Sequence, residues 1–203
     1  MPTPTPSPTA RPSAQDVAFL QAAHQDNLAE IQAGTAAEHR GSSAAARDLG
    51  VRLVREHTSL DADLQRIAAR LNLDMPTTPT ADRQRQLEQV SLHTGKAFDR
   101  AWVATVTAWN SEALISNQQE AQSGTLDDVR GLARDAVDLV RGHLSRLTRV
   151  PLDEPQLPTP ARTNDDYVVS QSPLVISVAT GMIVLGGTML VLTARAGLFR
   201  RRR

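Results

Sequence analysis

The chain has 203 residues, with 22 basic and 22 acidic side chains and a formal net charge of zero at pH 7. It contains no cysteine, which excludes a disulfide framework and a thiolate nucleophile. Only 3% of the residues are aromatic and basic residues are not in excess, so we expect no nucleic-acid partner, because such binding needs a basic face.

Proline marks the ends of the folded region. Five of the 12 prolines lie within residues 1–12 and five within residues 151–173, and the other two are Pro76 and Pro79. Inside a helix, proline removes a backbone hydrogen bond and clashes with the preceding turn. We therefore predict a disordered Pro-rich N-terminus at 1–12, a helical domain at 13–150 and a Pro-rich stalk at 151–173.

The first half of the domain carries two helical patterns. Ser13 or Asp16 can cap the first helix, and Gly41-Ser42-Ser43 ends it and caps the next. Apolar or small residues recur at steps of three and four along the first helix, at Phe19, Leu20, Ala23, Ile31 and Gly34. The second helix has an apolar stripe made by Leu49, Leu53, Leu60, Leu64, Ile67 and Leu71.

The second half begins after a turn at 75–80. We expect a short helix near Asp82–Leu92, a long helix capped by Thr94 and a last helix that starts at Gly124-Thr125. The inward residues of the two long helices are Phe98, Trp102, Val106, Ala113, Leu114, Val129, Leu132, Ala136, Val140 and Leu147. No strand-like alternation occurs in 13–150. The pattern predicts an all-α fold, an antiparallel four-helix bundle with short loops.

Residues 174–194 form an uncharged apolar run from Leu174 to Ala194, just after Pro173. A helix rises about 1.5 Å per residue, so roughly 20 apolar residues cross the hydrocarbon core of a bilayer. A buried core helix is the alternative, but the glycines of the run and its lack of a polar face favour a span. We expect one C-terminal transmembrane helix with the lipid bilayer as its partner.

Charge predicts the orientation of this span. The tail at 195–203 contains five basic residues, Arg195, Arg200, Arg201, Arg202 and Arg203. The other 17 basic residues and all 22 acidic ones precede the span, which gives that part a net charge of −5. Basic residues stay on the cytoplasmic side, so we predict a single-pass plasma-membrane protein with the tail inside and the bundle outside.

The N-terminus shows no secretory signal that would carry the bundle to the outside. The start MPTPTPSPTARPS has neither a basic n-region nor an apolar h-region. The predicted orientation therefore requires a secretory signal upstream of Met1. Insertion by the C-terminal span alone would instead leave the bundle in the cytoplasm.

Four polar side chains lie on or beside the apolar stripes of the four long helices: Glu30, His57, Asn110 and His143. If the helices pack together, these side chains meet in one layer. The layer could hold a small ligand or a metal ion, with Glu30, His57 and His143 as metal ligands. Alternatively, it is a hydrogen-bonded network that fixes the register of the helices. Neither hypothesis is excluded by the sequence.

Four stretches of the domain resemble one bacterial family: AQDVAFLQAAHQDNLAEIQAG (14–34), VRLVREHTSLDADL (51–64), GKAFDRAWVATV (95–106) and VRGHLSRL (140–147). The resemblance is to the envelope family called domain of unknown function 4142. It implies a ferritin-like four-helix bundle, often exported, with no established activity. The polar pattern of the family falls on Asp16, Glu30, His57, Phe98-Asp99 and His143. Asn110 stands where the pattern has a histidine, so any shared metal site would lose a ligand here.

No set of catalytic residues can be recognised. Ferritin-type di-iron sites need a Glu-x-x-His pair on two helices, and no glutamate of this chain has histidine three residues later. A Gly-rich phosphate loop and a nucleophile-elbow serine are also lacking. His24 and His93 match no apolar stripe and are expected to face solvent. We therefore expect no enzymatic activity, and no cofactor other than the metal ion considered above.

Together these features predict a membrane-anchored bundle that binds an envelope protein or a small ligand, or that serves as a structural module of the envelope. The alternative is a metal-binding or redox protein that uses the polar layer. A third hypothesis is a sensor that signals through the span to a partner, because the tail at 195–203 is too short for an output domain.

Overall fold

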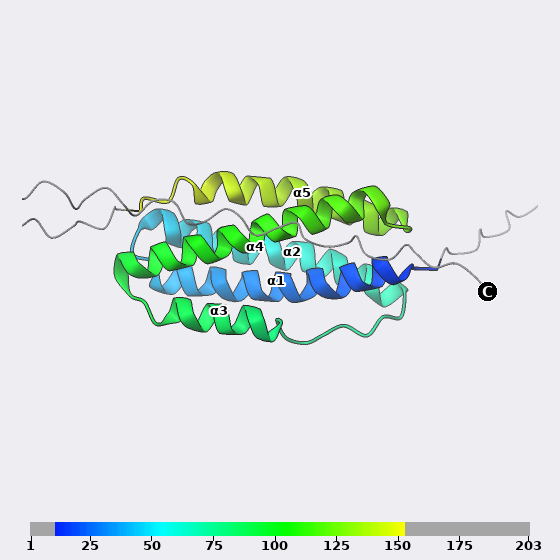
Figure 1. The fold of residues 1–203 in the computed structure, drawn as a ribbon, viewed down its shortest axis with the longest axis horizontal. Helices are drawn as coiled ribbons and strands as arrows, with labels where there is room; N and C mark the ends of the chain where they lie inside the picture. Colours follow the sequence, from blue (N-terminus) through cyan, green and yellow to red (C-terminus); the bar gives the residue numbers. More distant parts are fainter. Residues whose placement is uncertain (1–10, 153–203) are drawn as a thin grey trace, which may run out of the picture. The chain divides into compact units, whose positions relative to one another are not determined.

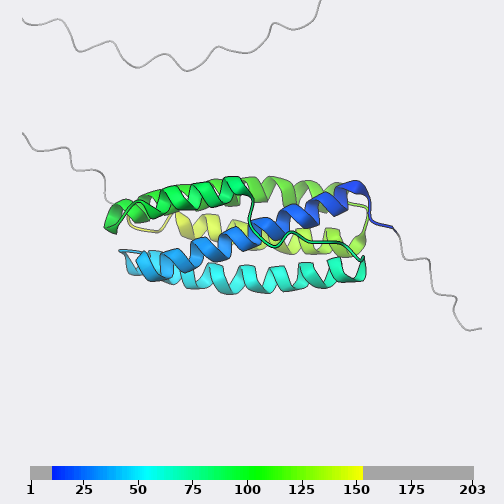
Figure 2. The same cartoon turned by 90° about the horizontal axis from the view of Figure 1, so that it is seen from below.

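The computed structural model describes residues 11–152, which form five α-helices. These are α1 (Ala14–Arg40), α2 (Ala44–Arg70), α3 (Ala81–Ser91), α4 (Gly95–Ser123) and α5 (Asp127–Leu147). The four long helices pack side by side as a bundle, and the short α3 lies against α1 and α4 (Figure 1). Neighbouring long helices run antiparallel in both views (Figures 1 and 2). The prediction of an all-α helical bundle is confirmed.

The predicted fold class needs a correction, because it added a transmembrane helix to the bundle. No helix within residues 11–152 is long and apolar enough to cross a membrane, since each long helix carries charged residues along its outer side. The proposed span from Leu174 to Ala194 and the arginine tail lie outside the described residues. A single-pass localisation therefore has no support in the described helices and stays a prediction.

A long connection joins α2 to α4 and contains α3. It turns back at the end of α2 and runs along α1 (Figures 1 and 2), where Gln21 donates to the backbone oxygen of Asp74 at 3.0 Å. Gln25 donates in the same way to Thr78 at 3.1 Å. As a result, α4 starts at the same end of the bundle as α2 and runs parallel to it. The prediction of short loops is wrong here, and a single long crossover is typical of ferritin-like bundles.

Capping side chains define the helix starts. Ser13, one of the two predicted capping residues, caps α1 and forms a capping box with the other, Asp16. Asp16 also caps α5, because its Oδ1 accepts a hydrogen bond from the backbone nitrogen of Thr125 at 2.8 Å. Thr125 is therefore not the cap, and α5 begins at Asp127 without a side-chain cap of its own. Thr94 occupies the cap position of α4 but makes no capping hydrogen bond.

Asp99 of α4 binds the start of another helix at the opposite end of the bundle, as Asp16 does at its own end. Its two carboxylate oxygens accept hydrogen bonds from the backbone nitrogens of Ser42 at 2.8 Å and Ser43 at 2.9 Å, where α2 starts. The carboxylates of Asp16 and Asp99 are both buried. Burial alone would raise the pKa of Asp16, but hydrogen bonds from Ser13 and Thr125 outweigh it and lower that pKa to about 2.

Two apolar clusters fill the bundle within the described residues. One contains Leu53, Phe98 and Trp102, and the indole nitrogen of Trp102 donates to the backbone oxygen of Ala33 at 2.9 Å. The other contains Leu20, Leu64 and Val129. Several buried polar residues lie between the members of these two clusters, among them His24 and Asn27 of α1, His57 and Asp61 of α2 and His143 of α5. The middle of the core is therefore polar, whereas Asp16 and Asp99 are buried near the ends.

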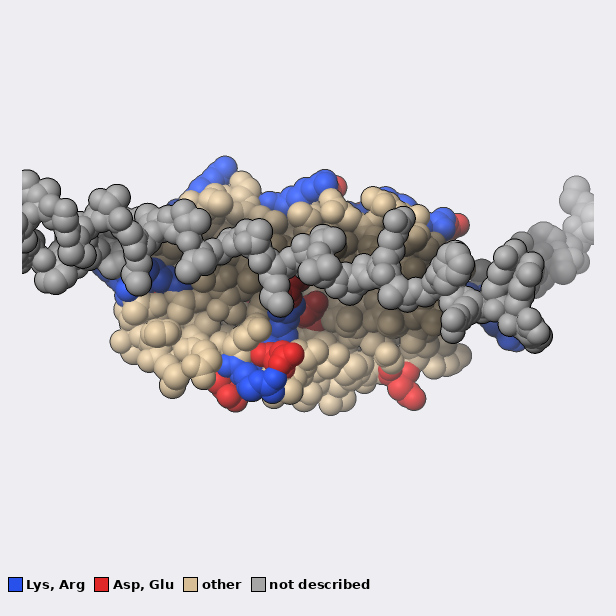
Figure 3. Space-filling model, in the orientation of Figure 1, with Lys and Arg blue, Asp and Glu red and all other residues tan. Residues whose placement is uncertain are grey.

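Surface charges are mixed in sign. On the face drawn in Figure 3, basic and acidic side chains that are not covered by grey atoms lie close to one another. Among the ion pairs of the described residues, Arg70 of α2 with Asp128 of α5, at 2.5 Å, joins different helices. Exposed pairs of this kind contribute about 0–1 kcal/mol each, so packing and the buried polar groups determine the fold.

Helices α1 and α2 approach each other closely at Gly34 and Gly50. A Cβ atom on Gly34 would lie 2.8 Å from the backbone oxygen of Gly50, and one on Gly50 would lie 2.6 Å from that of Gly34. Both obstacles are backbone atoms, so the clash could be relieved only by moving the two helices apart.

We predict that Gly34→Ala and Gly50→Ala each lower the free energy of unfolding by about 1–3 kcal/mol, the range typical of overpacking. Gly131→Ala in α5 is the matched control, because its Cβ would meet only the Arg134 side chain at 3.9 Å. Alanine should be neutral there or stabilise the helix by up to roughly 1 kcal/mol. Urea denaturation measures all three, and equal effects would contradict the close approach.

Candidate functional site

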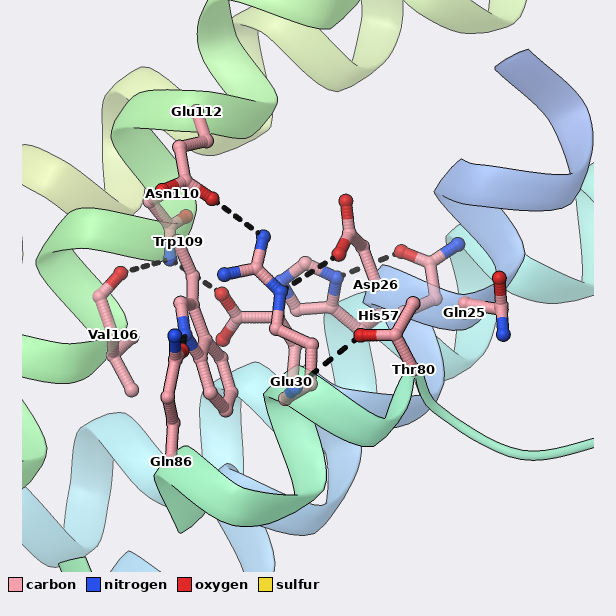
Figure 4. A network of polar contacts seen from close by, with 12 residues as sticks. Gln25, Asp26, Glu30, His57, Thr80, Gln86, Val106, Trp109, Asn110 and Glu112 are labelled. Atoms are coloured by element: carbon pink, nitrogen blue, oxygen red, sulfur yellow. Dashed lines mark hydrogen bonds and ion pairs between the residues drawn. The ribbon is translucent and has the colours of Figure 1, made fainter. Parts of the chain in front are cut away.

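The structure brings Glu30, His57, Asn110 and His143 together in the middle of the core, one from each long helix. All four are buried, with at most 4% of their surface exposed. Asn110 Nδ2 donates to Glu30 Oε1 at 2.8 Å, and Asn110 Oδ1 lies 3.2 Å from His143 Nδ1. The ring centroids of His57 and His143 are 5.1 Å apart. Figure 4 shows Glu30, His57 and Asn110 close together inside the bundle.

The polar layer also contains residues that sequence reasoning missed. His24 was predicted to face solvent, but it is 5% exposed and its Nδ1 lies 2.6 Å from Asp61 Oδ1, so that prediction is wrong. His93 is exposed, as predicted. A signal for His24 was present in the sequence, because His24, Asn27 and Glu30 follow one another at steps of three, which places them on one side of α1.

The tautomer of His57 is set by Asn27 and Asp61. Asn27 Nδ2 faces Asp61 Oδ1 at 3.4 Å, so the amide oxygen of Asn27 faces His57 Nδ1, at 2.9 Å. An amide oxygen only accepts, so Nδ1 must carry the proton and Nε2 bears a lone pair. Burial, together with the charge of His143, lowers the pKa of His57 to about 3, so the ring is neutral at physiological pH. Nε2 is buried and has no hydrogen-bond partner among residues 11–152.

His143 is engaged at both ring nitrogens. Its Nε2 lies 2.8 Å from Glu56 Oε2, and its Nδ1 faces Asn110. Glu56 and His57 point to different sides of α2, as expected of adjacent residues, yet both reach His143. Burial alone would raise the pKa of Glu56, but hydrogen bonds from His143 and Arg52 outweigh it and lower that pKa. Burial lowers the pKa of His143.

Glu30 has one satisfied and one unsatisfied carboxyl oxygen. Oε1 accepts the hydrogen bond from Asn110, whereas Oε2 is buried and has no partner in the described part of the chain. Burial and the nearby charge of Asp26 raise the pKa of Glu30 to about 8, although the charge of Arg83 opposes this shift. At neutral pH the side chain is therefore mostly a neutral carboxylic acid, and the hydrogen bond at Oε1 leaves Oε2 as the site for the proton.

Glu30 and His57 line the same cavity, which has a volume of about 40 Å³. A cavity holds one water molecule for roughly every 10–15 Å³ of this measure, so there is room for about three. Its other polar walls include Asn27, Asn110 and Asn117. Its apolar walls are Phe19, Ala23, Leu60, Leu64, Ala113, Leu132, Ala136 and Val140.

Arg83 of α3 separates the cavity from solvent on one side. Its Nε donates to Asp26 Oδ1 at 3.0 Å, and its Nη2 donates to Glu112 Oε2 at 2.9 Å (Figure 4). The guanidinium carbon lies 4.9 Å from the centroid of the Trp109 ring. Only 11% of the Arg83 side chain is exposed. The crossover thus places α3 over the polar layer, with its arginine charge balanced by two carboxylates.

This geometry limits which of the predicted ligands could bind a metal ion. Within residues 11–152, no group of three or more His, Cys, Asp or Glu side chains is arranged to hold a metal ion. Because both nitrogens of His143 have partners, two of the three predicted ligands offer a free atom, Oε2 of Glu30 and Nε2 of His57. Metal binding stays a prediction.

Four long helices with one crossover and a polar layer at mid-length define a helical bundle protein of ferritin-like connectivity. The chain belongs to the family described as domain of unknown function (DUF4142), whose sequence model matches residues 1–150. This confirms the resemblance drawn from the sequence. No curated protein matches the chain.

A solved structure supports the same fold. The crystal structure of a DUF305 fragment from Deinococcus radiodurans is similar to this chain with a TM-score of 0.62. The match covers 69% of this chain and 97% of the fragment at 14% sequence identity. At this identity the similarity concerns the fold alone.

The pKa of Glu30 predicts how stability depends on pH. Between about 4.5 and 8, the folded state binds a proton at Glu30 that the unfolded state does not, so stability falls as pH rises through this window. The limiting slope for one such group is about 1.4 kcal/mol per pH unit. Glu30→Gln keeps an oxygen for Asn110 and removes the titration, so its stability relative to the native protein should rise with pH.

Urea denaturation of both proteins from pH 4 to 9 measures this difference. A constant difference across the range would mean that Glu30 titrates as an ordinary exposed glutamate. His57 acts in the opposite direction, because its lowered pKa makes stability fall as pH drops from about 6.5 to 3. This second effect is common to both proteins and cancels in the comparison.

Proposed function

We propose that this protein is a non-enzymatic binding module that takes a small polar ligand into the cavity between Glu30 and His57. One observation carries the proposal: of the three buried side-chain atoms that lack a partner within residues 11–152, two, Glu30 Oε2 and His57 Nε2, belong to residues that line one cavity. An unsatisfied buried polar group costs about 1–3 kcal/mol, and native proteins retain few of them. A ligand that bonds both atoms would recover this cost.

A purely structural polar layer would be expected to satisfy its own members. His24, Asn27 and Asp61 do so, since each has at least one hydrogen bond to another member. Glu120 Oε1 also lacks a partner, but Glu120 does not line this cavity. The free donor and acceptor of the layer therefore occur where there is room for a bound molecule.

The low basicity of His57 argues against a role for it as a general base. An efficient general base has a pKa near the working pH, because it must be unprotonated and still attract a proton. The pKa of His57 is about 3, so its lone pair is a weak base at neutral pH. It is better suited to accept a hydrogen bond than to remove a proton. Binding without chemistry is therefore the function we favour.

A second candidate is a transition-metal site, favoured by the way His57 is held. Metal-binding histidines usually donate their other ring N–H to a fixed acceptor, which aims the free nitrogen at the ion. Asn27, itself contacting Asp61, provides such an acceptor. The site would offer two protein ligands, His57 and the carboxylate of Glu30, so a metal would have to displace the Glu30 proton and take its remaining ligands from solvent.

A thermal-shift screen of the full chain tests the proposal. The probes are neutral and charged polar compounds of up to about six non-hydrogen atoms, with divalent metal ions as a separate set. Ala136→Leu and Ala113→Leu are the controls, because both residues line the cavity and leucine would fill part of it. We expect at least one organic compound to raise Tm in the native protein and to have little effect in either variant.

The screen can also contradict the proposal. Compounds that raise Tm equally in the native protein and in both folded variants would bind elsewhere. A complete lack of shifts among the organic compounds, with a shift from a metal ion that is lost in His57→Gln, would favour the second candidate instead.

A further inference from the structure

Resting on the proposed function, we infer that the ligand of this cavity is a small uncharged molecule that both accepts and donates a hydrogen bond, as primary amides and alcohols do. Glu30 Oε2 would donate to it and His57 Nε2 would accept from it. The inference follows from what each side chain can offer once its other hydrogen bonds are made.

Glu30 is fixed as a donor by its surroundings. Its carboxyl group receives one hydrogen bond, from Asn110, and is otherwise buried. A carboxylate with a single hydrogen bond is costly to bury. The cation at the rim, Arg83, already pairs with Asp26 and Glu112. The neutral acid is therefore favoured, and its O–H finds no acceptor among the residues that the structure describes.

His57 is fixed as an acceptor by the opposite arrangement. Its Nδ1–H donates to Asn27, whose amide cannot turn over without losing its contact with Asp61. Asp61 is itself held by His24 at 2.6 Å and by Gln65 at 2.5 Å. This chain of contacts keeps the lone pair on Nε2. One donor and one acceptor thus belong to the same cavity.

Charged ligands fit this pair poorly. An anion would find one O–H donor and an acceptor lone pair, and the charge of Arg83, which also lines the cavity, is already balanced by Asp26 and Glu112. A cation would have to remove the Glu30 proton and leave an ion pair beside Phe19, Leu60 and Leu64, where desolvation is unfavourable. An uncharged ligand avoids both costs, and its apolar part can contact these same walls.

The charged and titratable groups around the pair come from every helix of the bundle. They are Asp26 of α1, Glu56 of α2, Arg83 of α3 and Glu112 of α4, and α5 adds the titratable ring of His143. Burial and Asp26 raise the pKa of Glu30 to about 8, against the opposing charge of Arg83. Affinity for an uncharged donor–acceptor ligand should therefore be constant at neutral pH and fall by up to tenfold per unit above about pH 8, as the donor is lost.

Four probes of nearly the same shape test the inference: acetamide, acetone, acetate and acetamidinium. Each is titrated into the full chain while backbone amide chemical shifts are recorded by NMR. We expect acetamide to bind at least tenfold more tightly than the other three. Acetone lacks the donor for His57, acetate is an anion and acetamidinium is a cation.

Two variants identify the atoms involved. Glu30→Gln can still accept from Asn110 and present an N–H in place of the acid O–H, so acetamide affinity should persist and lose its fall above pH 8. His57→Leu removes the acceptor, and acetamide affinity should drop at least tenfold. The four-probe series on the native chain decides the inference even if His57→Leu does not fold.

Other outcomes overturn the inference in distinguishable ways. Tighter binding of acetamidinium or acetate would show a charged ligand, and equal binding of acetone would show that His57 is not used. Each of these outcomes would contradict the inference but not the proposal that the protein is a binding module. If none of the four probes binds while the thermal-shift screen finds a ligand of this cavity, only the inference fails. If neither experiment finds a ligand, both fail.

Discussion

Buried polar groups need partners, and this requirement links all four long helices at the middle of the bundle. Asn110 of α4 bridges Glu30 of α1 and His143 of α5, and His57 of α2 is held by Asn27 of α1. Sliding one helix by a turn would leave the apolar clusters at both ends partly filled, but it would strand several of these groups at about 1–3 kcal/mol each. The polar layer therefore specifies the register that apolar packing alone would define less strictly.

Two carboxylates fix the ends of the same bundle. Asp16 joins the start of α1 to the start of α5, and Asp99 joins α4 to the start of α2. The buried polar residues thus have two structural roles. Asp16 and Asp99 hold helix ends, whereas Glu30, His57 and His143 meet in the layer. Asn110 uses its amide to donate to Glu30 and to face His143, two contacts that one neutral imidazole in its place could make less completely.

Much of this arrangement can be predicted from the sequence, because the spacing of apolar residues along a helix and the capping of its start are local properties. The apolar stripes, the Ser13 cap and the meeting of Glu30, His57, Asn110 and His143 follow from such patterns. The pairing of His24 with Asp61 does not, because it depends on which side of α1 faces α2. The crossover of α3 and the capping of α5 by Asp16 likewise arise from contacts between residues about 50 to 110 positions apart. The segment at 174–203 lies outside the described residues, and the bundle itself supplies no membrane span.

The central claim is that the core holds a neutral His57 whose free nitrogen belongs to the same cavity as a protonated Glu30. Imidazole ¹⁵N chemical shifts of His57, followed by NMR from pH 4 to 8, test it most directly. We predict a protonated Nδ1 and an unprotonated Nε2 across this range, because the pKa of about 3 keeps the ring neutral. A proton on Nε2, or a titration of the ring near pH 6.5, would contradict the account.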